Sequence, residues 1–199
     1  MMECNTNLNN YKIILGSHSP RRKELLEKTG LKFIVKSSDV KEDFKNFIDV
    51  EEAAKSMANL KANSFNDLKN NEILICADTL VSVEKKILGK PKSEKEAEEM
   101  LRLLSGKVHK VTTGVAIKSN KNQKNFFEST EVVFKELTEK EIKYYIKNYK
   151  PFDKAGSYAI QEWIGLIGIK KIIGSYFNVM GLPTEKLYSE LIKFCYEKN

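Results

Sequence analysis

A carboxylate inside an apolar segment is the first feature of this sequence that could do chemistry. Asp78 lies in the stretch 74–83, LICADTLVSV. A carboxylate is costly to bury there unless it is paired or binds a metal ion. Asp78 is therefore a candidate metal ligand or general base at a sheet edge, or else a strand-end aspartate that bonds to the backbone. Glu42, in SSDVKEDF, is a second candidate carboxylate, although a loop glutamate commonly just faces solvent.

Two adjacent arginines follow the turn from a predicted strand into a predicted helix. The stretch 16–30 reads GSHSPRRKELLEKTG, in which Ser19 can cap the helix and Pro20 suits its first position. Free amides and the positive end of the helix dipole favour an anion there. Arg21 and Arg22 add forked donors that suit phosphate. A capped amphipathic helix with two solvated arginines fits the same residues.

Two lysines stand in segments that restrict the backbone or admit close neighbours, namely Lys90 in LGKP and Lys154 in DKAGSYAIQ. Either one alone fits solvated surface. Together, the basic residues could surround several phosphates while Glu42 and Asp78 hold a divalent cation; this basic set is Arg21, Arg22, Lys61, Lys90 and Lys154. Mg²⁺ commonly takes one or two carboxylates plus substrate phosphates. The sequence has no G-x-x-x-x-G-K-[ST] motif, so a P-loop is not the phosphate cradle.

Composition and charge exclude several classes of protein. The chain has 199 residues, of which 41% are hydrophobic and 31% charged, and a formal net charge of +7. No apolar run approaches the roughly 20 residues that cross a bilayer, and no signal-peptide pattern is visible.

The widely spaced Cys4, Cys76 and Cys195 predict neither disulfides nor zinc, so we expect a cytoplasmic protein, with Cys76 in the core. With only His18 and His109, a histidine mechanism has little support, and His109 is expected to make structural hydrogen bonds.

Strands and helices alternate along the chain, which predicts an α/β protein with a mixed sheet. We expect helices over 20–30, 49–68, 93–106, 138–148 and 184–196. We expect strands over 13–15, 31–40, 72–83, 107–119 and 125–137, with a polar interruption at Asp78 and the last two strands forming a hairpin. Residues 1–199 are expected to form one domain, with residues 1–10 as a flexible tail.

Taken in order, these segments resemble the Maf family of nucleoside triphosphate pyrophosphatases. The matching pieces are GSHSPRRKELLEKTG, VKED, LKA, CADTLV, ILGKP, EAEEMLRLLSGKVHKVTTG, YYIKNYKPFDKAGSYAIQ and GSYFNVMGLP. Each piece is weak by itself, but their order and spacing from about Tyr11 to Leu191 make a specific signal.

The resemblance implies a twisted mixed sheet with surrounding helices and two lobes around a deep cleft, commonly in a homodimer. It also implies that water attacks the α-phosphate of a nucleoside triphosphate, giving the monophosphate and pyrophosphate, with Mg²⁺ or Mn²⁺ required. Asp78 matches the family's catalytic aspartate and Glu42 its other cleft acid, so both are candidate metal ligands. The residues that match the family's substrate-binding positions are Ser17, Arg22, Lys61, Lys90 and Lys154.

Within the family, Arg21, Thr79 and Gln161 match the branch that prefers dTTP and UTP over 7-methyl-GTP. A glutamine side chain has one acceptor and two donors, which suits the O4 and N3 edge of thymine or uracil. Three positions depart from the family pattern. His18 stands where the family usually has a small residue, Lys41 where an acidic residue is usual, and Glu162 where glycine is usual.

Two other functions fit parts of the sequence. The basic charge suits a nucleic-acid-binding or cell-division regulatory protein with little catalysis, and the phosphate-binding set suits a phosphatase that releases orthophosphate. The pyrophosphatase is favoured over nucleic-acid binding because the basic residues share their motifs with carboxylates, which repel a nucleic-acid backbone unless a metal ion is bound. We expect no membrane partner.

Overall fold

The fold is built on one mixed sheet of seven strands, in the order β2-β1-β3-β5-β6-β7 with β4 paired to β3 off that path. The structure is a computed structural model of the chain and describes residues 8–37, 40, 43 and 47–196. Strand β1 runs parallel to β2 and β3, and the other pairs are antiparallel. The predicted α/β class with a mixed sheet is confirmed.

The elements alternate as the sequence indicates. The strands are β1 Lys12–Gly16, β2 Phe33–Lys36, β3 Glu72–Val83, β4 Lys86–Leu88, β5 Val108–Lys118, β6 Gln123–Phe134 and β7 Ile169–Ile173. The α-helices are α1 Pro20–Lys28, α2 Val50–Asn63, α3 Glu94–Leu104, α4 Glu139–Tyr149, α5 Trp163–Gly168, α6 Tyr176–Met180 and α7 Thr184–Tyr196. Two short 3₁₀ helices, η1 Leu8–Asn10 and η2 Ala155–Ser157, complete the described secondary structure.

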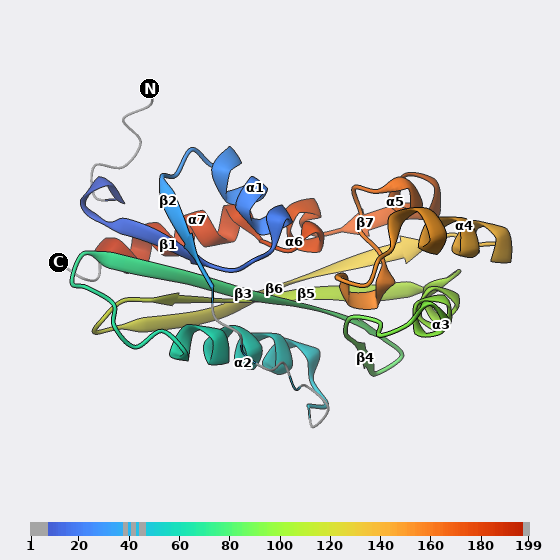
Figure 1. Cartoon of the computed structure of the whole chain (residues 1–199), viewed down its shortest axis with the longest axis horizontal. Coiled ribbons are helices and arrows are strands. Elements are labelled where there is room, and N and C mark those ends of the chain that lie inside the picture. Colours follow the sequence, from blue (N-terminus) through green and yellow to red (C-terminus); the bar gives the residue numbers. More distant parts are fainter. Residues whose placement is uncertain (1–7, 38–39, 41–42, 44–46, 197–199) are drawn as a thin grey trace.

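Helices cover both faces of the sheet (Figure 1). Helix α2 lies along one face, against β3 and β5, while α1, α6 and α7 lie over the other face. Helices α3, α4 and α5 gather at the end of the sheet where β5 begins and β6 ends. The main core lies on the side of α1 and α7, and a smaller cluster, which includes the buried Cys76, packs beneath α2. The prediction that Cys76 is a core residue is confirmed.

One edge of β3 is interrupted. Residues 72–75 pair with β1 and residues 81–83 pair with β4, but no described strand pairs with residues 76–80 on that edge. The opposite edge of β3 is paired with β5 along its whole middle. The interruption therefore leaves an opening at the side of the sheet without breaking the strand, and Asp78 lies at its centre.

A glycine opposite Asp78 lets α2 approach the sheet closely. Gly114 on β5 is the direct partner of Asp78, and such antiparallel partners project to the same face of a sheet. A Cβ atom built on Gly114 would lie 2.1 Å from the carbonyl oxygen of Ala54. The backbone of α2 therefore rests directly on β5, and this approach brings Lys61, near the end of α2, to the side of Asp78.

Most predicted elements are confirmed. Helix α1 begins as expected: Ser19 accepts a hydrogen bond from the amide of Arg22 at 3.5 Å, and Pro20 is its first residue. Strands β5 and β6 form the predicted hairpin, and α7 has the predicted bounds.

Two expectations are wrong in detail. Strand β3 continues through Asp78, because that residue keeps its pairing with Gly114. Helix α2 ends at Asn63 instead of reaching residue 68. Helix η1 includes Leu8, which packs in the core; residues 1–7 lie outside the described part of the chain, and the flexible tail over residues 1–10 stays a prediction. The sequence reasoning proposed no elements for α5, β7 and α6.

Within the described residues, no helix is both long and apolar enough to span a membrane.

The close approach of α2 gives a test of the fold. Gly114→Ala should lower the free energy of unfolding by about 1–3 kcal/mol, the usual cost of overpacking a core, because the new methyl group meets backbone that cannot move aside. Thermal melting measures the change. Gly168→Ala is the control, since its methyl group would meet only the end of the Leu137 side chain, at 3.1 Å. Equal melting temperatures for the two variants would contradict the close contact.

Candidate active site

A cavity of about 420 Å³ opens at the interrupted edge of β3. Its walls come from the turn before α1, from the end of α6 and from the linker between α4 and α5, residues 150–162, which we call the α4–α5 linker. Every predicted site residue that lies in the described part of the chain lines this cavity; they are Ser17, Arg21, Arg22, Lys61, Asp78, Thr79, Lys90, Lys154 and Gln161. Glu42 and Lys41 lie outside the described residues.

A buried ion pair lies at the base of the cavity. Lys61 donates a hydrogen bond to Asp78, and their side chains are 15% and 6% exposed. A lone carboxylate at this depth would be strongly destabilising, so the ammonium group compensates its charge. The partner of Asp78 in this contact is a side chain of α2, and Asp78 also lines the cavity.

Among the described residues, the cavity offers a carboxylate that suits a metal ion bound together with substrate phosphates. The described residues contain no group of three or more His, Cys, Asp or Glu side chains placed to hold a metal. Asp78 contributes one carboxylate to the cavity wall. Because Mg²⁺ binds through one or two carboxylates and takes its remaining ligands from phosphates and water, this residue fits such an ion.

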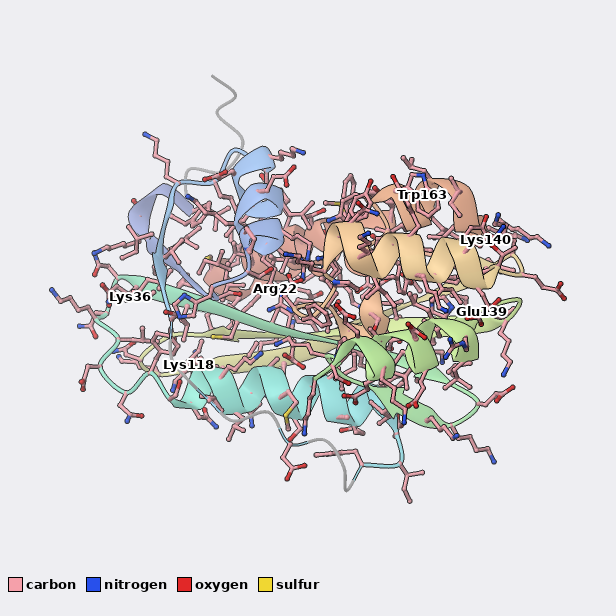
Figure 2. All side chains as sticks on the ribbon, turned by 45° about the vertical axis from the view of Figure 1, so that its right-hand side comes forward. Arg22, Lys36, Lys118, Glu139, Lys140 and Trp163 are labelled. Atoms are coloured by element: carbon pink, nitrogen blue, oxygen red, sulfur yellow. The ribbon has the colours of Figure 1, made fainter. Side chains whose placement is uncertain are left out.

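Arg22 is fixed by partners from three separate segments. Its Nε donates to the carbonyl of Gly181 at 2.8 Å, and its terminal nitrogens donate to Thr79 Oγ1 at 3.0 Å and to Ser17 Oγ at 3.4 Å. Thr79 also bonds to Thr113 on β5, at 3.0 Å. Figure 2 shows Arg22 at the start of α1. The guanidinium is therefore held in one position at the cavity wall.

Arg21 points to the opposite wall. Its guanidinium donates to Asp153 at 2.8 Å, and the other oxygen of Asp153 accepts from Lys154, also at 2.8 Å. Burial opposes ionisation of Asp153, but the hydrogen bonds from Lys154 and Arg21 outweigh it and lower the pKa of that carboxyl to about 2. Asp153 thus joins α1 to the α4–α5 linker across the cavity. The sequence reasoning did not select Asp153, although it directly precedes Lys154.

Lys154 and Lys90 are brought together by the backbone. The amide of Gly156 donates to the carbonyl of Gly89 at 3.0 Å, which ties the α4–α5 linker to the segment after β4. Lys154 is 7% exposed and also pairs with Glu162 at 3.2 Å. Lys90 is exposed at the cavity rim. Two cations from distant parts of the sequence therefore face the same space.

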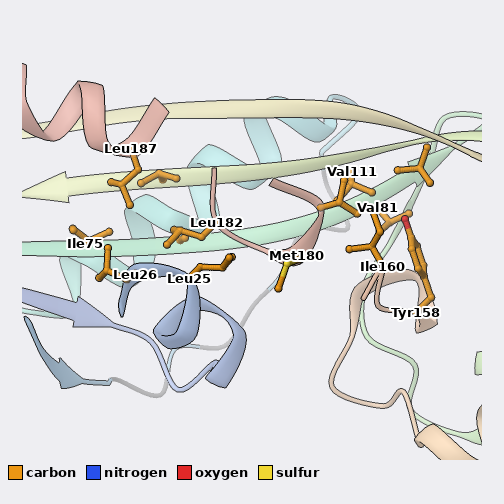
Figure 3. Close-up of a cluster of buried hydrophobic side chains, with 14 of the residues drawn as sticks. Leu25, Leu26, Ile75, Val81, Val111, Tyr158, Ile160, Met180, Leu182 and Leu187 are labelled. Atoms are coloured by element: carbon orange, nitrogen blue, oxygen red, sulfur yellow. The ribbon is translucent and has the colours of Figure 1, made fainter. Parts of the chain in front are cut away.

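Gln161 presents an unused acceptor. Its Oε1 atom is buried and has no hydrogen-bond partner among the described residues. A buried amide oxygen of this kind is costly unless a ligand or water donates to it. The neighbouring floor of the cavity is apolar, formed by Val81, Val111, Tyr158 and Met180. In Figure 3, Met180 lies between Leu25 and Leu182 on one side and Val81 and Val111 on the other, and all five side chains belong to one core cluster.

The histidines take no direct part in this arrangement of charges. His109 is buried and its Nε2 contacts the hydroxyl of Tyr158 at 2.7 Å, which confirms its structural role. Burial lowers the pKa of His109 to about 4, so the ring is neutral at neutral pH. His18 is exposed at the cavity rim.

Comparisons with known proteins identify the family of this chain. The family model described as "Maf-like protein" matches residues 12–194. The chain is 53% identical to the dTTP/UTP pyrophosphatase of Christiangramia forsetii, over 92% of this chain and 94% of that protein. It is 50% identical to the protein of the same name from Phocaeicola vulgatus, over 94% and 98%. Among solved structures, a HAM1 protein from Coxiella burnetii matches 92% of this chain and 99% of its own, with a TM-score of 0.49 and 14% identity. The family model and the sequence relatives together show that this chain belongs to the Maf family.

Proposed function

We propose that this protein hydrolyses dTTP and UTP to the nucleoside monophosphate and pyrophosphate. The observation that carries the proposal is one cavity in which a buried, paired carboxylate, several fixed cations and an unused amide acceptor face the same space. The family membership and the names of the relatives support the same activity.

The triphosphate is the part of the substrate that the cations recognise. Arg22, Lys90 and Lys154 approach the cavity from three different segments, so they can contact different phosphate groups. Forked arginine donors and lysine ammonium groups both suit phosphate oxygens. Ser17 adds a hydroxyl beside Arg22. These side chains line a cavity and do not form an open surface. This arrangement favours a nucleotide over a nucleic-acid backbone.

Asp78 is the proposed general base. It accepts a proton from a water molecule whose oxygen attacks the α-phosphorus; the bond from that phosphorus to the bridging oxygen breaks, and its electron pair leaves with pyrophosphate. Lys61 compensates the carboxylate charge in the buried site. A divalent cation, Mg²⁺ or Mn²⁺, would be held by Asp78, and by Glu42 as the second proposed ligand; it would neutralise charge on the phosphates.

Base selection is assigned to Gln161, supported by Thr79 and Arg21. The Oε1 atom of Gln161 can accept from N3–H of thymine or uracil, and its amide nitrogen can donate to O4. Thr79 fixes Arg22, and Arg21 fixes Asp153, so these two act by shaping the walls around the nucleotide. The homodimer, the cytoplasmic location and the single domain over residues 1–199 stay predictions.

Asp78→Asn should abolish most turnover, because it removes the charge and the base at nearly constant shape; it also removes the charge that pairs with Lys61, so some loss of stability is expected. We expect kcat to fall by about 10²-fold or more, the usual contribution of a general base. Steady-state rates are compared with melting temperature. A variant that retains near-normal rates and the metal requirement would rule out Asp78 as the base.

Substrate choice tests the function itself. On a mixed nucleotide pool with Mg²⁺ or Mn²⁺, the wild type should consume dTTP and UTP before ATP, GTP or 7-methyl-GTP, with pyrophosphate as the product. Gln161→Glu replaces the donor end of the amide with an acceptor, so it should lower the preference by about tenfold or more while the product stays the same.

The outcomes separate the possible activities. Orthophosphate as the product would indicate a phosphatase instead. A wild type that prefers purine nucleotides, or a Gln161→Glu variant with unchanged preference, would remove Gln161 from base selection.

A further inference from the structure

The turn that carries Gln161 is a short, closed segment of the α4–α5 linker. The amide of Glu162 donates to the carbonyl of Ala159 at 3.1 Å, which closes a four-residue turn, 159–162. Gln161 lies within this turn and lines the cavity. Its position therefore depends on how the two ends of the turn are held.

One buried hydroxyl contacts both ends of the turn. Tyr145 on α4 is completely buried. Its hydroxyl accepts a hydrogen bond from the amide of Ala159 at 3.2 Å and donates one to the carboxylate of Glu162. Burial, together with the hydrogen bond to Glu162, raises the pKa of the Tyr145 phenol, so it stays protonated and keeps donating at any working pH.

The turn is also held from its other side and linked to a phosphate-binding lysine. The second oxygen of Glu162 pairs with Lys154 at 3.2 Å. A Cβ atom on Gly165 would lie 1.9 Å from the carbonyl oxygen of Ile160, so α5 packs directly against the middle of the turn. Tyr145 closes the remaining side. Gln161 is thus presented by a segment with few ways to move.

We infer that Tyr145 is a positioning residue for base selection: its hydroxyl fastens both ends of the turn 159–162 and so holds the Gln161 amide at the cavity wall. The inference rests on the proposed preference for dTTP and UTP. Tyr145 is not on the cavity wall, so it acts through Gln161 and not by touching the nucleotide. Glu162, which stands where the family usually has glycine, supplies the acceptor that completes this contact.

Tyr145→Phe removes the hydroxyl and keeps the ring. Tyr149→Phe is the matched control: it lies on the same helix, its ring stacks on Tyr145 at 5.1 Å, and its hydroxyl makes no hydrogen bond with the described residues. The measured quantity is the ratio of kcat/KM for dTTP to that for ATP. Both nucleotides carry the same triphosphate, so changes at Lys154 largely cancel in this ratio.

We expect Tyr145→Phe to lower the ratio by about tenfold, which corresponds to the free energy of about one buried hydrogen bond. Tyr149→Phe should leave the ratio unchanged. In a Gln161→Ala background, Tyr145→Phe should change the ratio no further, because the residue through which it acts is gone. If Tyr145→Phe does not fold, Glu162→Ala, at a partly exposed position, removes the hydrogen bond from the Tyr145 hydroxyl to Glu162 and should also lower the ratio.

The remaining outcomes overturn the inference. A lower melting temperature with equal losses for dTTP and ATP would show that Tyr145 is only structural. An effect of Tyr145→Phe that persists in the Gln161→Ala background would show that it does not act through Gln161. A wild type without any preference for dTTP and UTP would overturn the proposed function itself, whereas a wild-type preference that survives in Tyr145→Phe would overturn this inference alone.

Discussion

The ion pair between Lys61 and Asp78 is the interaction on which the rest of the site depends. A carboxylate in the middle of a buried strand is costly unless its charge is compensated, and here the compensating cation comes from a helix packed against the sheet. Gly114, the strand partner of Asp78, has no side chain, so the backbone of α2 can rest on β5 and deliver Lys61 to this point. The ion pair therefore depends on three features together: strand β3, helix α2 and the glycine at position 114.

The same strand also explains why the cavity lies where it does. The pairing of β3 with β1 stops before Asp78, and its pairing with β4 starts after Asp78, so this edge of β3 is open between the two. The start of α1 brings Arg22 to this opening, and the α4–α5 linker brings Lys154 and Gln161 to its other side. Asp153 and Arg21 join the two sides across the opening. An interruption in strand pairing thus gives the substrate access to residues that lie deep in the fold.

Local signals in the sequence predict much of this arrangement, and its gaps have physical causes. Ser19 and Pro20 mark the start of α1 by capping chemistry, and the hairpin follows from two long apolar strands around a polar loop. The polarity of Asp78 predicts an interruption of the strand, whereas its pairing with Gly114 depends on a strand that is distant in the sequence. The sequence motifs also predicted residues that line one cavity. The roles of Asp153, Tyr145 and Gly165 were not predicted, because each depends on a contact with another element that no local pattern reveals.

We propose that this site directs water to the α-phosphate, with Asp78 accepting the proton of that water. Hydrolysis of dTTP in water enriched in ¹⁸O, followed by mass spectrometry of both products, tests it directly, because the label marks the phosphorus that the water attacked. We expect one ¹⁸O atom in dTMP and none in pyrophosphate. Label in pyrophosphate with unlabelled dTMP would place the attack on the β-phosphorus and rule out this mechanism.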